Sequence, residues 1–220
     1  MTIEVVRNAR ARRMRLAVDP RSGQVRLTLP SRMPLRQGLA WAEEQQGWIA
    51  RQREKLPERQ PFAPGMRIPW GDSVLEIVWL AAGGRAPRRE GNVLLCGGPL
   101  EGLERRVERW LKTEALRLLS AETAEFAGKA RVTVSRVSVG DPRARWGSCA
   151  ASGAIRYSWR LAMAPDFVRR ATVAHEVAHR VHMNHAPAFH RLVAELLDAD
   201  PLPARVWLRT HGTSLHWIGR

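Results

Sequence analysis

One short segment near the C-terminal end constrains the fold more than any other part of the chain. Residues 172–190, TVAHEVAHRVHMNHAPAFH, hold five of the seven histidines. Apolar residues surround His175 and His179. Upstream, Pro165 and Asp166 are typical of a first helical turn, where proline needs no hydrogen bond and a carboxylate faces the positive end of the helix dipole. The segment therefore predicts a buried helix that carries two histidines four residues apart.

The spacing of these two histidines indicates a metal site. His175 and His179 lie one helical turn apart, so their imidazoles are neighbours and can bind one ion at about 2.0–2.1 Å. Glu176 lies about 100° around the helix from His175, so it flanks such an ion without binding it. This is the position of a general base that acts on metal-bound water. The HExxH pattern therefore favours a catalytic site with one zinc ion.

A third ligand must come from outside this pair. His182 falls within about 20° of His175 around the helix, but three histidines in one row do not surround a tetrahedral ion. We therefore expect His182 to be a partly exposed residue beside the site. Two other candidates follow later in the chain, namely His190 and Glu195, and they remain alternatives.

His185 is the favoured third ligand because a bend in the chain can turn it toward the pair. Asparagine tolerates the left-handed conformation, so we expect the first helix to end at Met183–Asn184. Pro187 then begins a second, short helix. At this corner His185 can point back toward His175 and His179, which completes a set of three imidazole ligands.

The rest of the chain predicts an α+β fold. Alternating apolar and polar residues predict a β-hairpin near the N-terminus, followed by a helix and a proline-rich loop. The expected elements are strands at 14–18 and 24–29, a helix at 34–56, strands at 74–80 and 92–96, a helix at 100–127, a strand at 131–139, a hairpin of 145–149 and 154–161, and helices at 165–184, 187–198 and from 201 onward. We expect a hairpin-and-helix subdomain at 1–98 and a catalytic domain at 99–220, which can pack as one compact unit.

Composition limits the cellular setting and the partners. Because the chain has no apolar run of about 18 residues and no apolar N-terminal region, we expect a cytoplasmic protein without a membrane span. Cys96 and Cys149 are then expected to be free thiols. The net charge of +15 is compatible with a nucleic-acid partner. However, the 33 arginines outnumber the three lysines and are spread along the chain, which favours compositional bias or a general anion-attracting surface.

The residues around the histidines form a combination that resembles a known family. They are Arg145-Trp146-Gly147-Ser148-Cys149, Trp159-Arg160-Leu161, Pro165, His175-Glu176-x-x-His179, Asn184-His185 and Phe189. In order and spacing they are similar to the YgjP-like metal-dependent hydrolases, small zincins related to the SprT-like metalloproteases. The resemblance covers nearly all of the chain. It implies a zincin-like domain in which His175, His179 and His185 bind zinc and Glu176 is catalytic.

Two departures from the family pattern concern the surroundings of the site. Ala186 replaces a serine that often follows the third histidine, and His190 stands where a tryptophan is usual. The first change affects the cap of the following helix, and the second affects one wall of the pocket. Neither change removes a ligand.

The hairpin before the metal helix is the expected substrate-binding element, because zincins bind an extended substrate along an edge strand. Gly147 would let a backbone approach closely, and Ser148 belongs to the same strand. Arg145 is either a structural ion-pair partner or a contact for an anionic substrate. Tyr157 is a candidate to polarise a substrate oxygen. Cys149 is expected to be a packed thiol, since a fourth protein ligand would close the site to water.

These predictions favour a zinc metallopeptidase with a peptide substrate. In this mechanism the ion lowers the pKa of bound water, and Glu176 removes its proton and passes it to the leaving group. The alternative is nucleoside triphosphate hydrolysis, because the family is also described as a UTP pyrophosphatase and an arginine-rich cleft suits phosphate. The lack of a glycine-rich phosphate loop counts against it. A nucleic-acid-associated protein with a structural metal is a third hypothesis, which the open fourth position disfavours.

Overall fold

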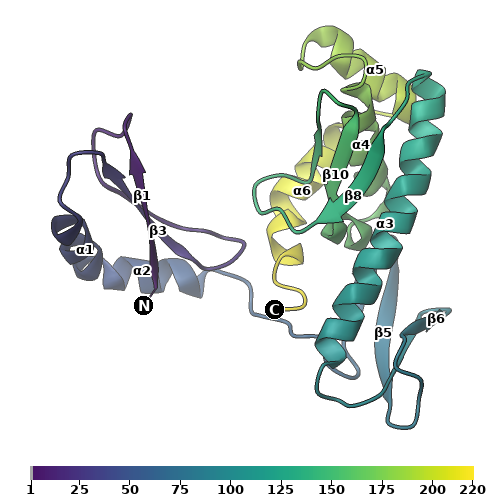
Figure 1. Cartoon of the computed structure of the whole chain (residues 1–220), viewed down its shortest axis with the longest axis horizontal. Helices are drawn as coiled ribbons and strands as arrows, with labels where there is room; N and C mark the ends of the chain where they lie inside the picture. The colour runs from purple at the N-terminus through teal and green to yellow at the C-terminus, as the bar shows by residue number, and fades with distance from the viewer. Residues whose placement is uncertain (1) are drawn as a thin grey trace. The chain divides into compact units, whose positions relative to one another are not determined.

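The computed structural model describes residues 2–220 and shows a mixed α+β fold, as expected. The chain forms two compact units, Met1–Glu58 and Arg59–Arg220, each with its own hydrophobic cluster. Figure 1 shows the first unit in purple and blue and the second from blue-teal to yellow. Within the described residues, no helix is both long and apolar enough to cross a membrane. Cys96 and Cys149 are free thiols, as predicted.

The N-terminal unit is a three-stranded sheet with two helices. Its elements are β1 (Ile3–Asn8), β2 (Arg15–Val18), β3 (Val25–Pro30), α1 (Leu35–Glu44) and α2 (Gln46–Glu54). The predicted hairpin is confirmed as the antiparallel pair β2 and β3, whereas β1, which pairs parallel to β3, was not predicted. The single helix predicted for this region is two helices that meet at Gln45. Leu27 and Leu29 of β3 pack with Ala42 of α1.

The C-terminal unit begins with a four-stranded sheet of order β4-β5-β7-β6. Its strands are β4 (Arg67–Trp70), β5 (Ser73–Leu80), β6 (Arg88–Glu90) and β7 (Val93–Gly97). The predicted strands are β5 and β7, which pair in parallel, whereas β4 and β6 were not predicted. The long helix α3 (Leu103–Ala130) follows. Its buried residues recur every four positions at Leu103, Val107, Leu111, Ala115 and Leu119, so that one face packs on the core.

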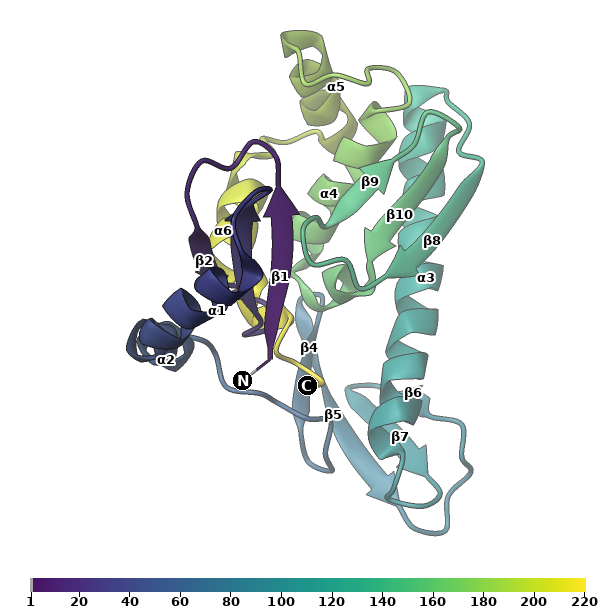
Figure 2. The ribbon, with the colours of Figure 1, turned by 60° about the vertical axis from the view of Figure 1, so that its left-hand side comes forward.

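A second sheet and three helices complete this unit. The elements are β8 (Arg136–Gly140), β9 (Gly147–Cys149), β10 (Ala154–Ser158), the 3₁₀ helix η1 (Trp159–Met163), α4 (Asp166–Ala178), α5 (Pro187–Leu197) and α6 (Leu202–Leu215). The predicted hairpin of β9 and β10 is confirmed, and β8 joins β10 in parallel. The order β8-β10-β9 makes β9 an edge strand. Figure 2 shows this sheet beside α3 and α4.

The compact units divide at Glu58, whereas the sequence analysis grouped residues 59–98 with the N-terminal hairpin. The β4-β5-β7-β6 sheet shares one hydrophobic cluster with α3 and α4, and its members in that cluster include Ile68, Ile77 and Leu94. The physical reason is that the apolar face of this sheet needs a cover, and α3 provides it. Residues 59–98 therefore belong to the unit that carries the histidines.

A buried ion pair fixes α4 against α3. Arg169 of α4 donates hydrogen bonds of 3.0 and 2.8 Å from Nε and Nη2 to Oε1 of Glu122 on α3. Both side chains are buried. Arg169 also donates a 2.8 Å bond from Nη1 to Asp166 in the first turn of its own helix. These contacts hold the N-terminal half of the helix that carries His175 and Glu176.

Candidate metal centre

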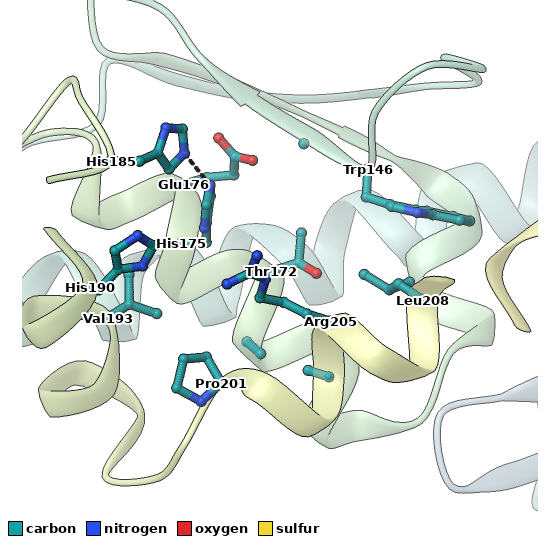
Figure 3. Close-up of a pocket in the computed structure, with 13 residues that line it drawn as sticks. Trp146, Thr172, His175, Glu176, His185, His190, Val193, Pro201, Arg205 and Leu208 are labelled. Atoms are coloured by element: carbon teal, nitrogen blue, oxygen red, sulfur yellow. Dashed lines mark hydrogen bonds between the residues drawn. The ribbon is translucent and has the colours of Figure 1, made fainter. Parts of the chain in front are cut away.

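Three imidazoles converge where α4 meets the following loop. One candidate ligand nitrogen each from His175, His179 and His185 lies within 4.8 Å of the other two. The Nε2 atoms of His175 and His185 are 3.2 Å apart (Figure 3). Two nitrogens bound to tetrahedral zinc at about 2.05 Å would be about 3.3 Å apart. The His175–His185 pair therefore has the spacing of two zinc ligands, and all three rings lie close enough together to bind one ion.

The helix that carries the first two histidines ends earlier than predicted. α4 ends at Ala178, and His179 follows with helical angles of φ −64° and ψ −15°, so it stays one turn from His175. The amides of residues 180 and 181 donate to carbonyls three residues earlier, which is the tighter 3₁₀ pattern. The chain therefore begins to leave the helix before Asn184.

The early turn gives His182 a role that the sequence did not indicate. Nδ1 of His179 lies 3.0 Å from the backbone carbonyl oxygen of His182. In the neutral ring, Nδ1–H donates to this carbonyl and leaves Nε2 as the free acceptor, as is common for metal-binding histidines. The imidazole of His182 is only partly buried and lies outside the histidine group, as expected.

His185 lies between the two helices, where its ring meets the other two. The side-chain oxygen of Asn184 accepts a 3.2 Å hydrogen bond from the amide of Ala186, and Pro187 begins α5. No side chain caps α5, which agrees with the missing serine at position 186. Phe189 in the first turn of α5 is buried, and its ring centroid lies 4.5–4.8 Å from those of all three imidazoles. It therefore forms an apolar floor under the group.

Burial and neighbouring positive charges favour the neutral form of His175 and His185. Burial is the main cause that lowers the pKa of His175 to about 4, and the charges of His179, His185, His190 and Arg205 contribute. The pKa of His185 is also lowered, by desolvation and then by His179, His190 and Arg205. Because a metal ion binds the deprotonated ring, neutral imidazoles at neutral pH suit a cation site.

Glu176 lies beside the histidines without a partner. Its side chain is buried and makes no hydrogen bond or ion pair within residues 2–220. Burial raises its pKa to about 7, against the opposing charge of Arg145. A Cβ atom added to Gly147 would lie 2.5 Å from Oε1 of Glu176. The sequence analysis assigned Gly147 to the approach of a substrate backbone, but in the structure its missing side chain makes room for this carboxylate.

A groove of about 330 Å³ separates β9 from the histidines. It is lined by Arg145, Gly147, Ser148, Cys149, His175, Glu176, His179, Met183 and His185. Arg145 is exposed and forms no ion pair within residues 2–220, so the structural ion pair considered for it is absent there. The Cys149 thiol packs against the core and lies outside the histidine group, and burial raises its pKa. Three of the four predicted substrate-binding residues thus lie along this groove.

Tyr157 lies elsewhere. Its side chain is fully buried, and its hydroxyl is 3.0 Å from Oγ1 of Thr123 on α3. Burial raises the pKa of this phenol well above its usual range. It lines neither the groove nor the pocket described next. Its suggested contact with substrate is therefore not possible in this structure, because the side chain is on the face of β10 that packs on α3.

The two rival ligands lie outside the histidine group. His190 and Glu195 are exposed on α5. The ring centroid of His190 is 6.3 Å from that of His185. His190 instead lines a second hollow that opens beside the histidines, as Figure 3 shows.

This second hollow is a pocket of about 420 Å³ among α4, α5 and α6, and the sequence analysis missed it. It is lined by Trp146, Gly147, Ala171, Thr172, His175, Glu176, His185, His190, Val193, Pro201, Ala204, Arg205 and Leu208. Gly212 of α6 allows the Trp146 ring to form one wall, since a Cβ atom there would lie 2.8 Å from that ring. No local pattern links α6 to the histidines, so only the fold reveals the pocket.

The part of the chain that holds these residues is similar to a known protein family. A family model described as "YgjP-like, metallopeptidase domain" matches residues 12–211, a span that includes all three histidines of the group and Glu176. No curated protein and no solved structure shows a significant match. The description names a metallopeptidase, which supports a metal-dependent hydrolase. The chain therefore belongs to the YgjP-like family.

Proposed function

We propose that the protein is a zinc-dependent peptidase in which His175, His179 and His185 bind the ion and Glu176 is the general base. The convergence of three imidazoles beside a buried carboxylate that makes no hydrogen bond or ion pair within residues 2–220 carries this proposal. When bound, zinc supplies Lewis acidity at one open coordination position. The donor set fits this ion, because imidazole nitrogens are among its preferred ligands.

Glu176 provides the proton transfer. Its carboxylate is held close to Gly147 at the groove, and no side chain in residues 2–220 competes for its oxygens. It accepts the proton of the attacking water and delivers it to the leaving amine. Because the Glu176 side chain is buried, its oxygens are poorly solvated and therefore reactive.

The edge strand β9 provides a place for an extended peptide. β9 pairs with β10 on one side only, so the other edge has backbone groups available for a further strand. An extended substrate that pairs there lies in the groove next to the histidines. Ser148 lies at the centre of this strand. This arrangement favours a polypeptide substrate.

A second candidate function, hydrolysis of a nucleoside triphosphate, is favoured by one observation. Arg136, Arg145 and Arg156 line a surface hollow on the β8-β10-β9 sheet, together with Ser138 and Ser148. Arg145 lines both this hollow and the groove beside the histidines. One guanidinium group can donate two parallel hydrogen bonds to the oxygens of a phosphate, so a surface with three arginines suits a polyphosphate chain.

One comparison tests these functions. Wild-type and Glu176→Gln protein, each loaded with zinc, are incubated with an unfolded protein and with UTP. We expect the wild type to cleave the unfolded protein and Glu176→Gln to lose at least about 100-fold in rate while it still binds one zinc ion per chain. Glu195→Gln, an exposed carboxylate on α5, is the matched control and should keep full activity.

The outcomes separate the hypotheses. Phosphate release from UTP that depends on Glu176, without proteolysis, would overturn the peptidase in favour of the triphosphate hydrolase. Loss of activity in Glu195→Gln would mean that α5 supplies a catalytic carboxylate. No reaction with either substrate would favour a structural metal.

A further inference from the structure

The pocket between α4, α5 and α6 opens directly onto the reactive end of the site. His175 and Glu176 line both this pocket and the groove along β9. When the scissile bond of a peptide substrate lies at the histidines, a neighbouring residue of that substrate therefore lies at the mouth of the pocket. The volume of about 420 Å³ is enough for one large side chain.

Most of the pocket wall is apolar, but one strong charge enters it. Val193 of α5, Leu208 of α6 and the Trp146 ring form apolar walls. Arg205 projects from α6 into the pocket, toward His175 and Thr172 (Figure 3).

The Arg205 guanidinium lacks an anionic partner in the protein. Within residues 2–220 its side chain forms no ion pair and no hydrogen bond. Arg205 is exposed to solvent, so its charge is accessible to a ligand that enters the pocket. An arginine beside apolar walls is strongly stabilised by a carboxylate, which it binds through two parallel hydrogen bonds.

We propose that this pocket binds a carboxylate-bearing residue next to the scissile bond, and that Arg205 determines this specificity. The proposal rests on the proposed peptidase function and names its substrate class. The carboxylate belongs either to an aspartate or glutamate side chain or to the free C-terminus of the substrate. The net charge of +15 favours the approach of such anionic substrates.

The pocket can be tested without hydrolysis. The full-length chain, freed of metal so that no carboxylate binds zinc, is titrated calorimetrically with 3-phenylpropanoate and with its amide. We expect the carboxylate to bind at least about tenfold more tightly than the amide. Arg205→Met should abolish this difference, whereas the matched variant Arg209→Met, one turn further along α6 and outside the pocket, should retain it.

Hydrolysis then distinguishes the two sources of the carboxylate. Zinc-loaded protein is given peptides that differ only in Glu or Gln after the scissile bond, and peptides that end one residue after it with a free or amidated C-terminus. A preference for Glu identifies the side chain, and a preference for the free terminus identifies the C-terminal carboxylate. In either case Arg205→Met should raise KM for the preferred substrate at least about tenfold and leave kcat nearly unchanged.

Two results would overturn the inference. One is equal binding of 3-phenylpropanoate and its amide to the wild type. The other is an equal loss of kcat on every peptide in Arg205→Met, because that would place Arg205 in the general catalytic machinery. If the wild type cleaves no peptide, the peptidase proposal fails, and the calorimetric comparison still decides whether Arg205 binds carboxylates.

Discussion

Gly147 and Glu176 occupy adjoining space, and one added methyl group is expected to separate them. In Gly147→Ala the new Cβ atom would lie 2.5 Å from Oε1 of Glu176, so the carboxylate must move. We expect kcat to fall at least about tenfold, because a general base must lie within hydrogen-bond reach of its proton. Zinc content should not change. Steady-state kinetics and metal analysis test this, with Gly128→Ala, where the Cβ atom meets nothing, as the control. Unchanged kcat in Gly147→Ala would contradict it.

The third ligand can be tested by replacing two histidines that follow α4. His185→Ala removes one of three imidazoles and is expected to lower zinc affinity at least about 100-fold, because two ligands from one helix leave the ion largely hydrated. His190→Ala, whose ring lies 6.3 Å from that of His185, should keep one zinc ion per chain. Competition with a chromogenic chelator measures both. If His190→Ala lowered zinc affinity more than His185→Ala, His190 would be the third ligand.

Among the helices, α4 depends on a buried charge pair for its position. In Glu122→Gln, Arg169 remains buried with one carboxylate partner, the more exposed Asp166, at 2.8 Å. We expect the free energy of unfolding to fall by about 3 kcal/mol. The double variant Glu122→Leu with Arg169→Met should recover most of this loss, since it leaves no buried charge unpaired. Urea unfolding measures both variants. A double variant less stable than Glu122→Gln would argue against this account.

A second charge cluster connects Asp141, which follows β8, with η1 and with the C-terminal end of the chain after α6. This cluster should make the free energy of unfolding depend on pH. Asp141 accepts hydrogen bonds from Arg160 of η1 and from Arg220, and Arg160 also donates to the carbonyl oxygens of Leu215 and Ile218. Burial raises the pKa of Asp141, but the hydrogen bonds and charge of Arg160, followed by the charges of Arg220 and His216, outweigh it and leave the pKa below its ordinary value.

Because the folded pKa of Asp141 lies below the unfolded one, its stabilisation is present above the ordinary aspartate pKa and is lost as the pH falls through the folded value. Asp141→Asn should therefore lower the free energy of unfolding by roughly 2–3 kcal/mol at neutral pH, and the difference from wild type should shrink as the pH falls below the ordinary aspartate pKa of about 3.9. Glu108→Gln, which breaks the exposed pair with Lys112, should cost less than about 0.5 kcal/mol. A difference for Asp141→Asn that does not vary with pH would count against the ion pairs.

At the scale of the whole molecule, the two hydrophobic clusters share no residue. One consists of residues from the first unit and the other of residues from the second, with the boundary after Glu58. We expect a fragment of residues 59–220 to unfold cooperatively and to bind one zinc ion. Residues 2–58 alone should be marginally stable, since so short a chain buries a small fraction of its surface. Circular dichroism melting and metal analysis test this, and a non-cooperative melt of 59–220 would contradict it.

Much of the local structure was predictable from local patterns. The hairpins of β2 with β3 and of β9 with β10 follow from alternation and turn residues. Strand β1 was not predicted because its partner β3 is distant in the sequence. Strands β4 and β6 pair with β5 and β7, which directly follow them, but they have only four and three residues, too few to show a clear alternating pattern. Tyr157 was misassigned for a related reason. Alternation along β10 shows that its side chains face two sides, but it does not show which side α3 covers.

The amino-acid sequence by itself determined the one-turn spacing of His175 and His179, the carboxylate between them and the turn that makes His185 available, because these depend on helical spacing and on residues a few positions apart. Only the tertiary structure decided which atoms meet across the chain. It placed Gly147 against Glu176 and Arg205 in a pocket beside His175. The physical reason is that packing brings together residues far apart in the chain, and no periodicity in the sequence records such contacts.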